Sequence, residues 1–228
     1  MALIVSEQSD WLAMITVAVI DDDPSIRRSL TRLLAASCYG ARVFASAQEF
    51  LDCSDCDGVS CIISDLRMPG MNGLDLQQAL RAKLPDVSIL FISGHGSIPA
   101  SVEAMKAGAV DFLVKPVSQK LLTDAIERAA TRTQERKARS NEKGDLEQRY
   151  YTLTVREREV FALVAAGLLN KQVAAELGVA LKTIKQHRGR VMDKMAADSF
   201  ADLVRMAETL GLHSDVDLIR AKGRAASA

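Results

Sequence analysis

The sequence predicts an α/β domain with a five-stranded parallel sheet, doubly wound and flavodoxin-like, followed by an all-α domain. With 228 residues, the chain is long for one compact domain. Its first half alternates short apolar runs with helical stretches, a pattern typical of a parallel sheet covered on both faces. After residue 150, only short helical patterns follow.

The elements of the first half can be assigned in order. Pro24 favours a first helical turn, and Gly108 follows an expected helix end. Expected strands are residues 17–20, 41–44, 59–64, 87–92 and 112–114. Expected helices are residues 24–36, 48–53, 74–83, 98–107 and 118–130.

Residues 131–148 are almost wholly polar and cannot supply a hydrophobic core. We expect a linker that continues the preceding helix. A dimerising coil is the alternative, although no heptad repeat is visible.

The second half predicts four short helices. Thr154 and Glu157 form a capping-box pattern before the first, and Asn170 can cap the second, which ends at Gly178. Ser199 can cap the fourth. The expected ranges are 155–165, 171–177, 181–195 and 200–210.

Composition is that of an ordinary soluble protein, with 48% hydrophobic and 25% charged residues. No segment approaches the roughly 20 apolar residues that cross a bilayer. The N-terminus carries Glu7 and Asp10 but no basic residue, so it is a poor secretory signal. We therefore expect a cytoplasmic protein with no membrane partner. Met14 is an alternative start to Met1.

Four cysteines lie close in sequence: Cys38, Cys53, Cys56 and Cys61. Cys53 and Cys56 could begin a metal or redox site, but no second C-x-x-C pair and no nearby His accompany them. We expect reduced thiols, with neither zinc nor a disulfide.

Polar residues follow most of the predicted strands, at the edge where parallel α/β sheets bind ligands. These residues are Asp21, Asp22, Asp23, Asp65, Ser93 and Lys115. Three or more carboxylates would meet there, and crowded carboxylates need a cation such as Mg²⁺.

A carboxylate can also attack phosphorus, with the cation and a lysine neutralising the transferred oxygens. Asp65, alone after the central strand, is the best nucleophile. Asp21 and Asp22 would bind the metal, and Asp23 would cap the next helix. From the residues alone, helix-capping and turn-forming acids remain the alternative.

Zero net charge predicts no general attraction to polyanions, but positive charge is concentrated locally. Between residues 181 and 194, five basic residues face one acidic residue. Ile184, Val191 and Met195 form an apolar stripe on this segment. A basic helix packed along one stripe after a short helix and a turn predicts a helix-turn-helix, although such charge can also be a solvated face.

The first half resembles the receiver domain of bacterial response regulators, particularly the FixJ-like group. The resemblance rests on residues 21–24 (DDDP), 64–73 (SDLRMPGMNG), 93–96 (SGHG) and 104–116 (AMKAGAVDFLVKP). It implies that a partner histidine kinase phosphorylates Asp65. The implied Mg²⁺ ligands are Asp22 directly, Asp21 through water, Asp65 and the backbone carbonyl of Arg67.

In the same resemblance, Lys115 pairs with the phosphoryl group and precedes a cis Pro116. Ser93 and Phe112 form the switch: the hydroxyl moves inward and the ring rotates after it. This would remodel the face made by residues 98–107 and the fifth strand, where related regulators dimerise. His95 is expected to be a loop residue without a catalytic role.

The second half resembles the LuxR-type DNA-binding domain in residues 153–160, 166–174, 183–188, 194–195 and 199–205. The residues expected to contact DNA are Asn170, Lys171, Lys182, Thr183, Lys185, Gln186, Arg188 and Arg190. Lys185, Gln186 and Gly189 would face the bases, and His187 would be half-packed. Two departures are Ala180, where Ser or Thr often caps the recognition helix, and Gly189, which has no side chain for readout.

The two resemblances together predict a transcription regulator of a two-component system, not an enzyme. Its expected partners are a histidine kinase, promoter DNA, a second copy of the chain and RNA polymerase. Rival functions are a phosphorylation-independent DNA binder and a Mg²⁺-dependent aspartyl-phosphate phosphatase. The expected segments are a disordered extension (1–14), receiver (15–130), helical linker (131–149), DNA-binding domain (150–213) and flexible tail (214–228).

Overall fold

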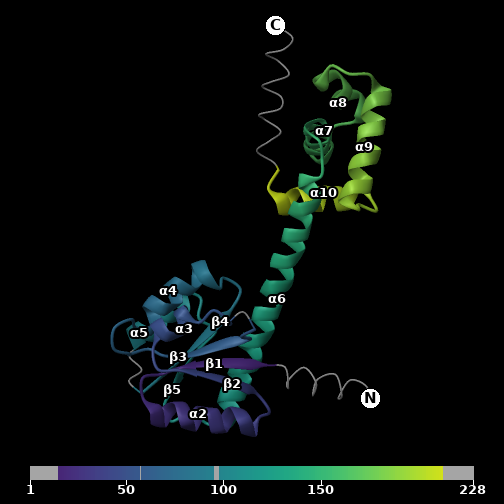
Figure 1. Ribbon diagram of the computed structural model, residues 1–228. Coiled ribbons are helices and arrows are strands. Elements are labelled where there is room, and N and C mark those ends of the chain that lie inside the picture. The colour runs from purple at the N-terminus through teal and green to yellow at the C-terminus, as the bar shows by residue number, and fades with distance from the viewer. Residues whose placement is uncertain (1–14, 57, 95–97, 213–228) are drawn as a thin grey trace, which may run out of the picture. The chain divides into compact units, whose positions relative to one another are not determined.

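The computed structural model describes residues 15–56, 58–94 and 98–212. The chain divides into two compact units, with the division between Ala138 and Arg139 (Figure 1). The expectations for the extension at 1–14, for His95 and for the tail at 214–228 lie outside the described residues.

The first unit is built on a five-stranded sheet, and every strand pairing in it is parallel. The strand order is β2-β1-β3-β4-β5, as expected for a flavodoxin-like doubly wound sheet. The strands are β1 (Thr16–Ile20), β2 (Gly40–Phe44), β3 (Cys61–Asp65), β4 (Ser88–Ser93) and β5 (Asp111–Val114).

Helices cover both faces of this sheet (Figure 1). They are α2 (Pro24–Ala36), α3 (Ala47–Asp52), α4 (Gly73–Lys83), α5 (Ile98–Lys106) and the first part of α6 (Gln119–Tyr151). Leu34 of α2 and Ile126 of α6 pack on the face that contains Val19. Phe50 of α3 and Leu76 of α4 pack on the opposite face. Successive side chains of each strand point to opposite faces of the sheet. Because both faces are covered, both sets of side chains are mostly apolar, and the strands read as continuous apolar runs.

Strand β3 begins later than the sequence predicted and includes Asp65 as its last residue. The expected start at Val59 is wrong, because the amide of Val59 donates to the carbonyl of Cys56 in a turn, at 3.2 Å. At the other end, Asp65 pairs with Ile92 of β4. Asp65 is therefore held by the sheet itself.

The expectation of four reduced thiols is also wrong. Cys53 and Cys56 are joined in a disulfide, with their Cα atoms 5.9 Å apart, within the usual range for such bonds. Cys53 caps the C-terminus of α3, and the turn after it brings Cys56 back into the core. Cys38 is free and exposed, and Cys61 is free and buried.

Helix α6 is continuous over 33 residues, as the polar stretch after residue 130 predicted. Its side chains are exposed from Ala138 to Lys143, whereas Leu146 is buried in the core of the second unit. Despite its length α6 is polar, and none of the helices that the structure describes is both long and apolar enough to cross a membrane.

The second unit packs the end of α6 with α7 (Val155–Ala165), α8 (Asn170–Leu177), α9 (Leu181–Met195) and α10 (Phe200–Leu210). The predicted capping box is present, because Thr154 N–H donates to Glu157 at 2.9 Å and Glu157 N–H donates to Thr154 at 3.3 Å. The predicted Asn170 cap is wrong. Helix α8 already begins at Asn170, and the side chain of Gln172 accepts from Leu169 N–H instead, at 2.8 Å.

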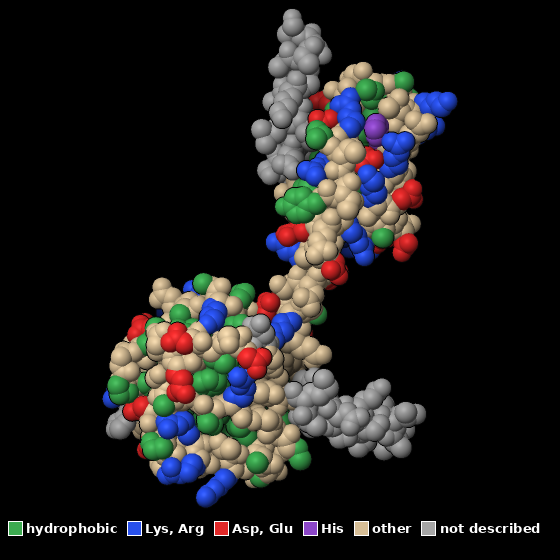
Figure 2. Space-filling model, in the orientation of Figure 1, with side chains coloured by type: hydrophobic (Ala, Val, Ile, Leu, Met, Phe, Trp, Pro, Cys, Tyr) green, Lys and Arg blue, Asp and Glu red, His purple; other side chains and the backbone are tan. Residues whose placement is uncertain are grey.

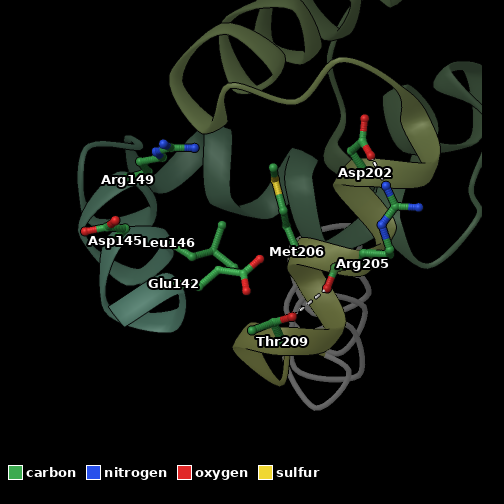
Figure 3. Close-up of a pocket in the computed structure, with 8 residues that line it drawn as sticks. All are labelled: Glu142, Asp145, Leu146, Arg149, Asp202, Arg205, Met206 and Thr209. Atoms are coloured by element: carbon green, nitrogen blue, oxygen red, sulfur yellow. Dashed lines mark hydrogen bonds and ion pairs between the residues drawn. The ribbon is translucent and has the colours of Figure 1, made fainter. Parts of the chain in front are cut away.

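A hollow of about 460 Å³ lies between the end of α6 and α10 (Figure 3). Its lining mixes acidic, basic and apolar side chains: Glu142, Asp145, Leu146, Arg149, Asp202, Arg205, Met206 and Thr209. None of these residues belongs to α8 or α9, although Arg149 donates to the carbonyl of Met195 at the end of α9, at 3.2 Å.

Candidate functional site

Three side chains that are far apart in the sequence meet at the carboxyl edge of the sheet. The ammonium of Lys115 donates to Oδ2 of Asp21 at 2.7 Å and to Oδ1 of Asp65 at 2.9 Å. Asp21 follows β1, Asp65 ends β3 and Lys115 follows β5, so the parallel sheet brings them together. Both carboxylates are nearly buried, with 4% and 9% of the side chain exposed.

The second oxygen of each carboxylate is oriented by the backbone. Oδ2 of Asp65 accepts from Arg67 N–H at 2.7 Å, and Oδ1 of Asp21 accepts from Asp23 N–H at 2.9 Å. Charge-assisted bonds of this kind fix the position of a carboxylate. Asp65 therefore presents Oδ1 toward the lysine.

Lys115 compensates the charge of this pair. Burial disfavours its ammonium form, but hydrogen bonds and charge from Asp21 and Asp65 outweigh burial and raise the pKa of Lys115 above its ordinary value. The three groups carry a formal net charge of about −1 when all are ionised. The edge therefore keeps an excess negative charge suited to a cation.

The expected convergence of three or more carboxylates is not seen. Asp22 is exposed, and Asp23 caps α2 by accepting from Ser25 N–H at 2.7 Å, as expected. Hydrogen bonds to Ser25 lower the pKa of Asp23. Among residues 15–56, 58–94 and 98–212, no three His, Cys, Asp or Glu side chains form a metal-binding group. Capping therefore removes one of the predicted acids from the cluster.

Ser93 and Phe112 lie on the neighbouring strands. Ser93 is buried at the end of β4, and its carbonyl accepts from Lys115 N–H at 2.9 Å. The Lys115–Pro116 bond is cis, as expected. Phe112 on β5 is partly buried, with its ring centroid 6.5 Å from that of Phe91. Ser93 thus contacts the backbone of Lys115, and Phe112 lies on the strand that leads to it.

Gly73 belongs to this site although it was not predicted as a site residue. A Cβ atom at Gly73 would lie 2.6 Å from the carbonyl oxygen of Asp65 and 2.8 Å from the ring of Phe91. The start of α4 therefore approaches the end of β3 closely enough to exclude any side chain. The one sequence feature that could have indicated this role is that Gly73 ends the segment 64–73, on which the resemblance to receiver domains rests.

In the second unit, α8 and α9 form the predicted helix-turn-helix. Gly178 ends α8 in the left-handed conformation, with φ of 64°. Ile184, Val191 and Met195 of α9 are buried, which confirms the apolar stripe. Ala180 stands at the cap of α9 without a side-chain hydrogen bond, as its methyl group predicted.

The other face of α9 is basic, and Figure 2 shows Lys and Arg side chains along this side of the unit. The exposed residues among the predicted contacts are Lys171, Lys182, Lys185, Gln186 and Arg190, and those partly buried are Asn170, Thr183 and Arg188. His187 is partly buried, as expected. Arg188 donates to the side chain of Asn170 at 3.1 Å and lies over the ring of Phe200, 5.6 Å from its centroid. Arg188 therefore links α8, α9 and α10.

Lys194 has a different role from the other basic residues of this helix. Its ammonium donates to Glu157 at 2.6 Å and to the carbonyl of Thr152 at 3.1 Å. Burial of Glu157 would raise its pKa, but the bonds and charge from Lys194 and Thr154 outweigh burial and lower the pKa. Lys194 thus joins the end of α9 to the start of α7.

Two protein families match this chain. Residues 17–127 match the family described as "Response regulator receiver domain", and residues 151–207 match "Bacterial regulatory proteins, luxR family". The chain is also 47% identical to "Nodulation protein W" of Bradyrhizobium diazoefficiens, over 87% of this chain and 88% of that protein. The chain belongs to the FixJ-like response regulators.

Other members of this family agree over both domains. The regulator is 42% identical to "Transcriptional regulatory protein FixJ" of Bradyrhizobium diazoefficiens, over 87% of this chain and 97% of that protein. It also resembles the solved structure described as "Low Resolution Structure of Response Regulator StyR", with a TM-score of 0.73, 42% identity, and coverage of 86% and 98% of the two chains.

Membership defines the function in outline. This response regulator takes part in two-component regulation of transcription, and its family is one of regulators, not enzymes. Receiver domains pair with histidine kinases and generally bind Mg²⁺ at the phosphorylation site, and LuxR-type domains bind DNA.

Proposed function

We propose that a histidine kinase transfers a phosphoryl group to Oδ1 of Asp65, and that Asp21, Asp22, Asp65 and the carbonyl of Arg67 hold Mg²⁺ during the transfer. The single observation that supports this most is the bridge from Lys115 to Asp21 and Asp65, at 2.7 and 2.9 Å. This bridge places a nucleophilic carboxylate oxygen, a second carboxylate and the lysine ammonium next to one another at the edge of the sheet.

Asp21, Asp65 and the carbonyl of Arg67 fit a hard divalent cation, because carboxylate and carbonyl oxygens are its preferred ligands. Asp22, exposed beside Asp21, would turn its carboxylate toward this edge to join them. When bound, Mg²⁺ neutralises phosphoryl oxygens that gain charge during transfer. The backbone amide of Arg67 holds Oδ2 of Asp65 while Oδ1 attacks. Lys115 then neutralises an oxygen of the phosphoryl group and keeps a bond to Asp21.

The proposed switch follows from the residues beside Lys115. Ser93 would move its hydroxyl toward the phosphoryl oxygens, and the partly buried ring of Phe112 would turn inward behind it. This movement would alter the surface of α5 and β5, where Ile98, Val102 and Val114 are exposed apolar residues. Two phosphorylated copies would pair through that surface.

Pairing would present two copies of α9 to two DNA half-sites, about one helical turn apart. Lys185 and Gln186 would face base edges, and Asn170, Lys171, Lys182, Thr183, Arg188 and Arg190 would contact the backbone. The corresponding domains are residues 15–130 and 150–213, joined by the helical linker 131–149. RNA polymerase is the proposed partner of the DNA-bound dimer.

Acetyl phosphate with Mg²⁺ tests the phosphorylation site on the whole chain. Intact-protein mass spectrometry should find one added phosphoryl group in the wild type and in Asp52→Asn, an exposed acid on α3. Asp65→Asn should show none. An Asp65→Asn protein that still gained a phosphoryl group and DNA affinity would refute the proposed nucleophile.

The DNA face is tested by the salt dependence of binding to a duplex selected with the phosphorylated protein. Three single variants are compared: Lys171→Ala, Lys182→Ala and Arg190→Ala. Each should make the plot of log affinity against log salt concentration less steep by roughly one unit, because each removes one phosphate contact. Arg205→Ala is the control, because Arg205 is an exposed basic residue of α10 that pairs with Asp202. Equal slopes for control and test variants would contradict the proposed face.

A further inference from the structure

The C-x-x-C pair after α3 has chemistry that phosphorylation and DNA binding do not use. Cys53 and Cys56 are bonded to each other, at the opposite end of β3 from Asp65. Cys53 is partly exposed, whereas Cys56 is 3% exposed and packs in the core. The bond therefore has one accessible sulfur and one protected sulfur.

A cation lies beside the accessible sulfur. Arg42 of β2 places Nη2 3.3 Å from Sγ of Cys53, and its other terminal nitrogen contacts the carbonyl and carboxylate of Asp55. A guanidinium at this distance stabilises a thiolate when the bond opens, and the thiolate is the reactive form in exchange. Arg42 thus gives Cys53 the surroundings of a reactive cysteine.

The other cysteines have different surroundings. Burial raises the pKa of Cys61 to about 12, so that its thiol stays protonated. Cys38 is exposed, with no disulfide partner among the described residues. A protein that works on chromosomal DNA meets a thiol-reducing medium, where disulfides are usually transient or redox-sensing.

We propose that Cys53 and Cys56 are a reversible dithiol–disulfide pair that exchanges with low-molecular-weight disulfides and dithiols. In oxidation, the thiolate of Cys53 attacks a small disulfide, forming a mixed disulfide and releasing one thiolate. Cys56 gives its proton to water, attacks Sγ of Cys53 and releases the second thiolate. Two electrons pass to the small disulfide, which leaves as two thiolates that take up protons from the solvent.

One short turn, which leads from Cys56 to β3, connects this cysteine pair to α6. Val59 N–H donates to the carbonyl of Cys56 at 3.2 Å, and the carbonyl of Val59 accepts from Lys137 of α6 at 3.4 Å. Opening the disulfide removes the link that holds Cys56 at the base of this turn. The reduced form therefore has a looser turn and a weaker hold on this part of α6.

A thiol-trapping experiment on the full-length protein tests the proposal. In a Cys38→Ser background, the protein is equilibrated with glutathione buffers of increasing oxidised fraction, then quenched in acid, unfolded and alkylated, so that buried thiols are labelled as well. We expect two fewer labels at the oxidising end, located at Cys53 and Cys56 by peptide mass spectrometry, and full return of both after native dithiothreitol. In a separate measurement on the folded, reduced protein, Arg42→Gln should slow the alkylation of the partly exposed Cys53.

Two results would overturn the proposal. One is labelling of both thiols in every buffer, which means that no disulfide forms. The other is a pair that native dithiothreitol cannot open, which means a fixed structural bond. Hydrogen exchange at the amide of Val59 tests the turn separately: it should be faster in the reduced protein, and equal rates would refute the proposed loosening. Neither measurement requires phosphorylation or DNA.

Discussion

Nζ of Lys115 lies 2.9 Å from Oδ1 of Asp65, at the edge where β5 and β3 end. The same ammonium also binds Asp21 at 2.7 Å, so a single lysine compensates two nearly buried carboxylates. Removing it would leave the carboxylates facing each other without a cation, which is costly in a buried setting.

Lys115→Met should therefore lower the free energy of unfolding of the receiver by roughly 1–3 kcal/mol at neutral pH. Millimolar Mg²⁺ should reduce this loss, because an ion at the proposed site would compensate the same two carboxylates. Both effects are measured by unfolding the protein in urea and monitoring the hydrogen exchange of the buried β3 amides. Lys83→Met, at the exposed end of α4, is the control. Equal stability of the two variants would contradict the bridging role of Lys115.

Gly73→Ala should lower the stability of the receiver by about 1–3 kcal/mol, the usual cost of overpacking. The added Cβ atom would press on the carbonyl of Asp65, so phosphorylation by acetyl phosphate should also slow. Gly144→Ala is the matched control, because that glycine lies in α6 with open space around it. It should stabilise the helix by roughly 0.5–1 kcal/mol. A neutral Gly73→Ala variant would contradict the close approach.

Lys194→Met should destabilise the second unit because it leaves Glu157 buried with its charge uncompensated. The loss should be about 1–3 kcal/mol at neutral pH, the range for an unsatisfied buried group. Exchange of the buried Ile184 and Val191 amides measures it.

The loss caused by Lys194→Met should also depend on pH. Because the folded-state pKa of Glu157 lies below 4.5, the pair contributes fully above about pH 4.5. Its contribution disappears as the pH falls through the lower folded-state value. The difference between wild type and Lys194→Met should therefore shrink in acid. A difference that stayed constant from neutral pH to pH 3 would contradict this linkage.

Ala180→Ser should stabilise α9 by about 1 kcal/mol, because Ala180 has the extended backbone of a cap but no side-chain acceptor. Ser199→Ala provides the reverse comparison, since Ser199 accepts from Asp202 N–H at 3.2 Å at the start of α10. That variant should lose a similar amount. Thermal unfolding of the full chain measures both, and shifts in the same direction would disagree with the capping geometry.

Much of the site was predictable because strand ends carry a simple signal. Asp21, Asp65 and Lys115 each follow or end an apolar run, and parallel strands place such residues at one edge. The apolar stripe of Ile184, Val191 and Met195 was equally clear from its helical spacing.

What the sequence could not predict depends on contacts between residues distant in the chain. The side chain of Asn170 accepts from Arg188, and the start of α8 is held instead by Gln172, whose side chain accepts from Leu169 N–H. Cys53 and Cys56 pair because of where the turn after α3 leads, which C-x-x-C spacing alone does not reveal. The close approach of Gly73 to Asp65 likewise arises from packing.

The middle of helix α6 should be the part of this helix that proteases cleave most readily. Its first turns are held by Ile126 and Ala129, and its last turns by Leu146, but the side chains from Ala138 to Lys143 are exposed. Gly144 follows, and glycine in a helix lowers stability by about 1 kcal/mol relative to alanine. Among the turns of α6, local unfolding should therefore cost the least free energy there. Among the basic residues of α6, brief trypsin digestion should cut first at Arg139 or Lys143, which would release two fragments that each keep their own core.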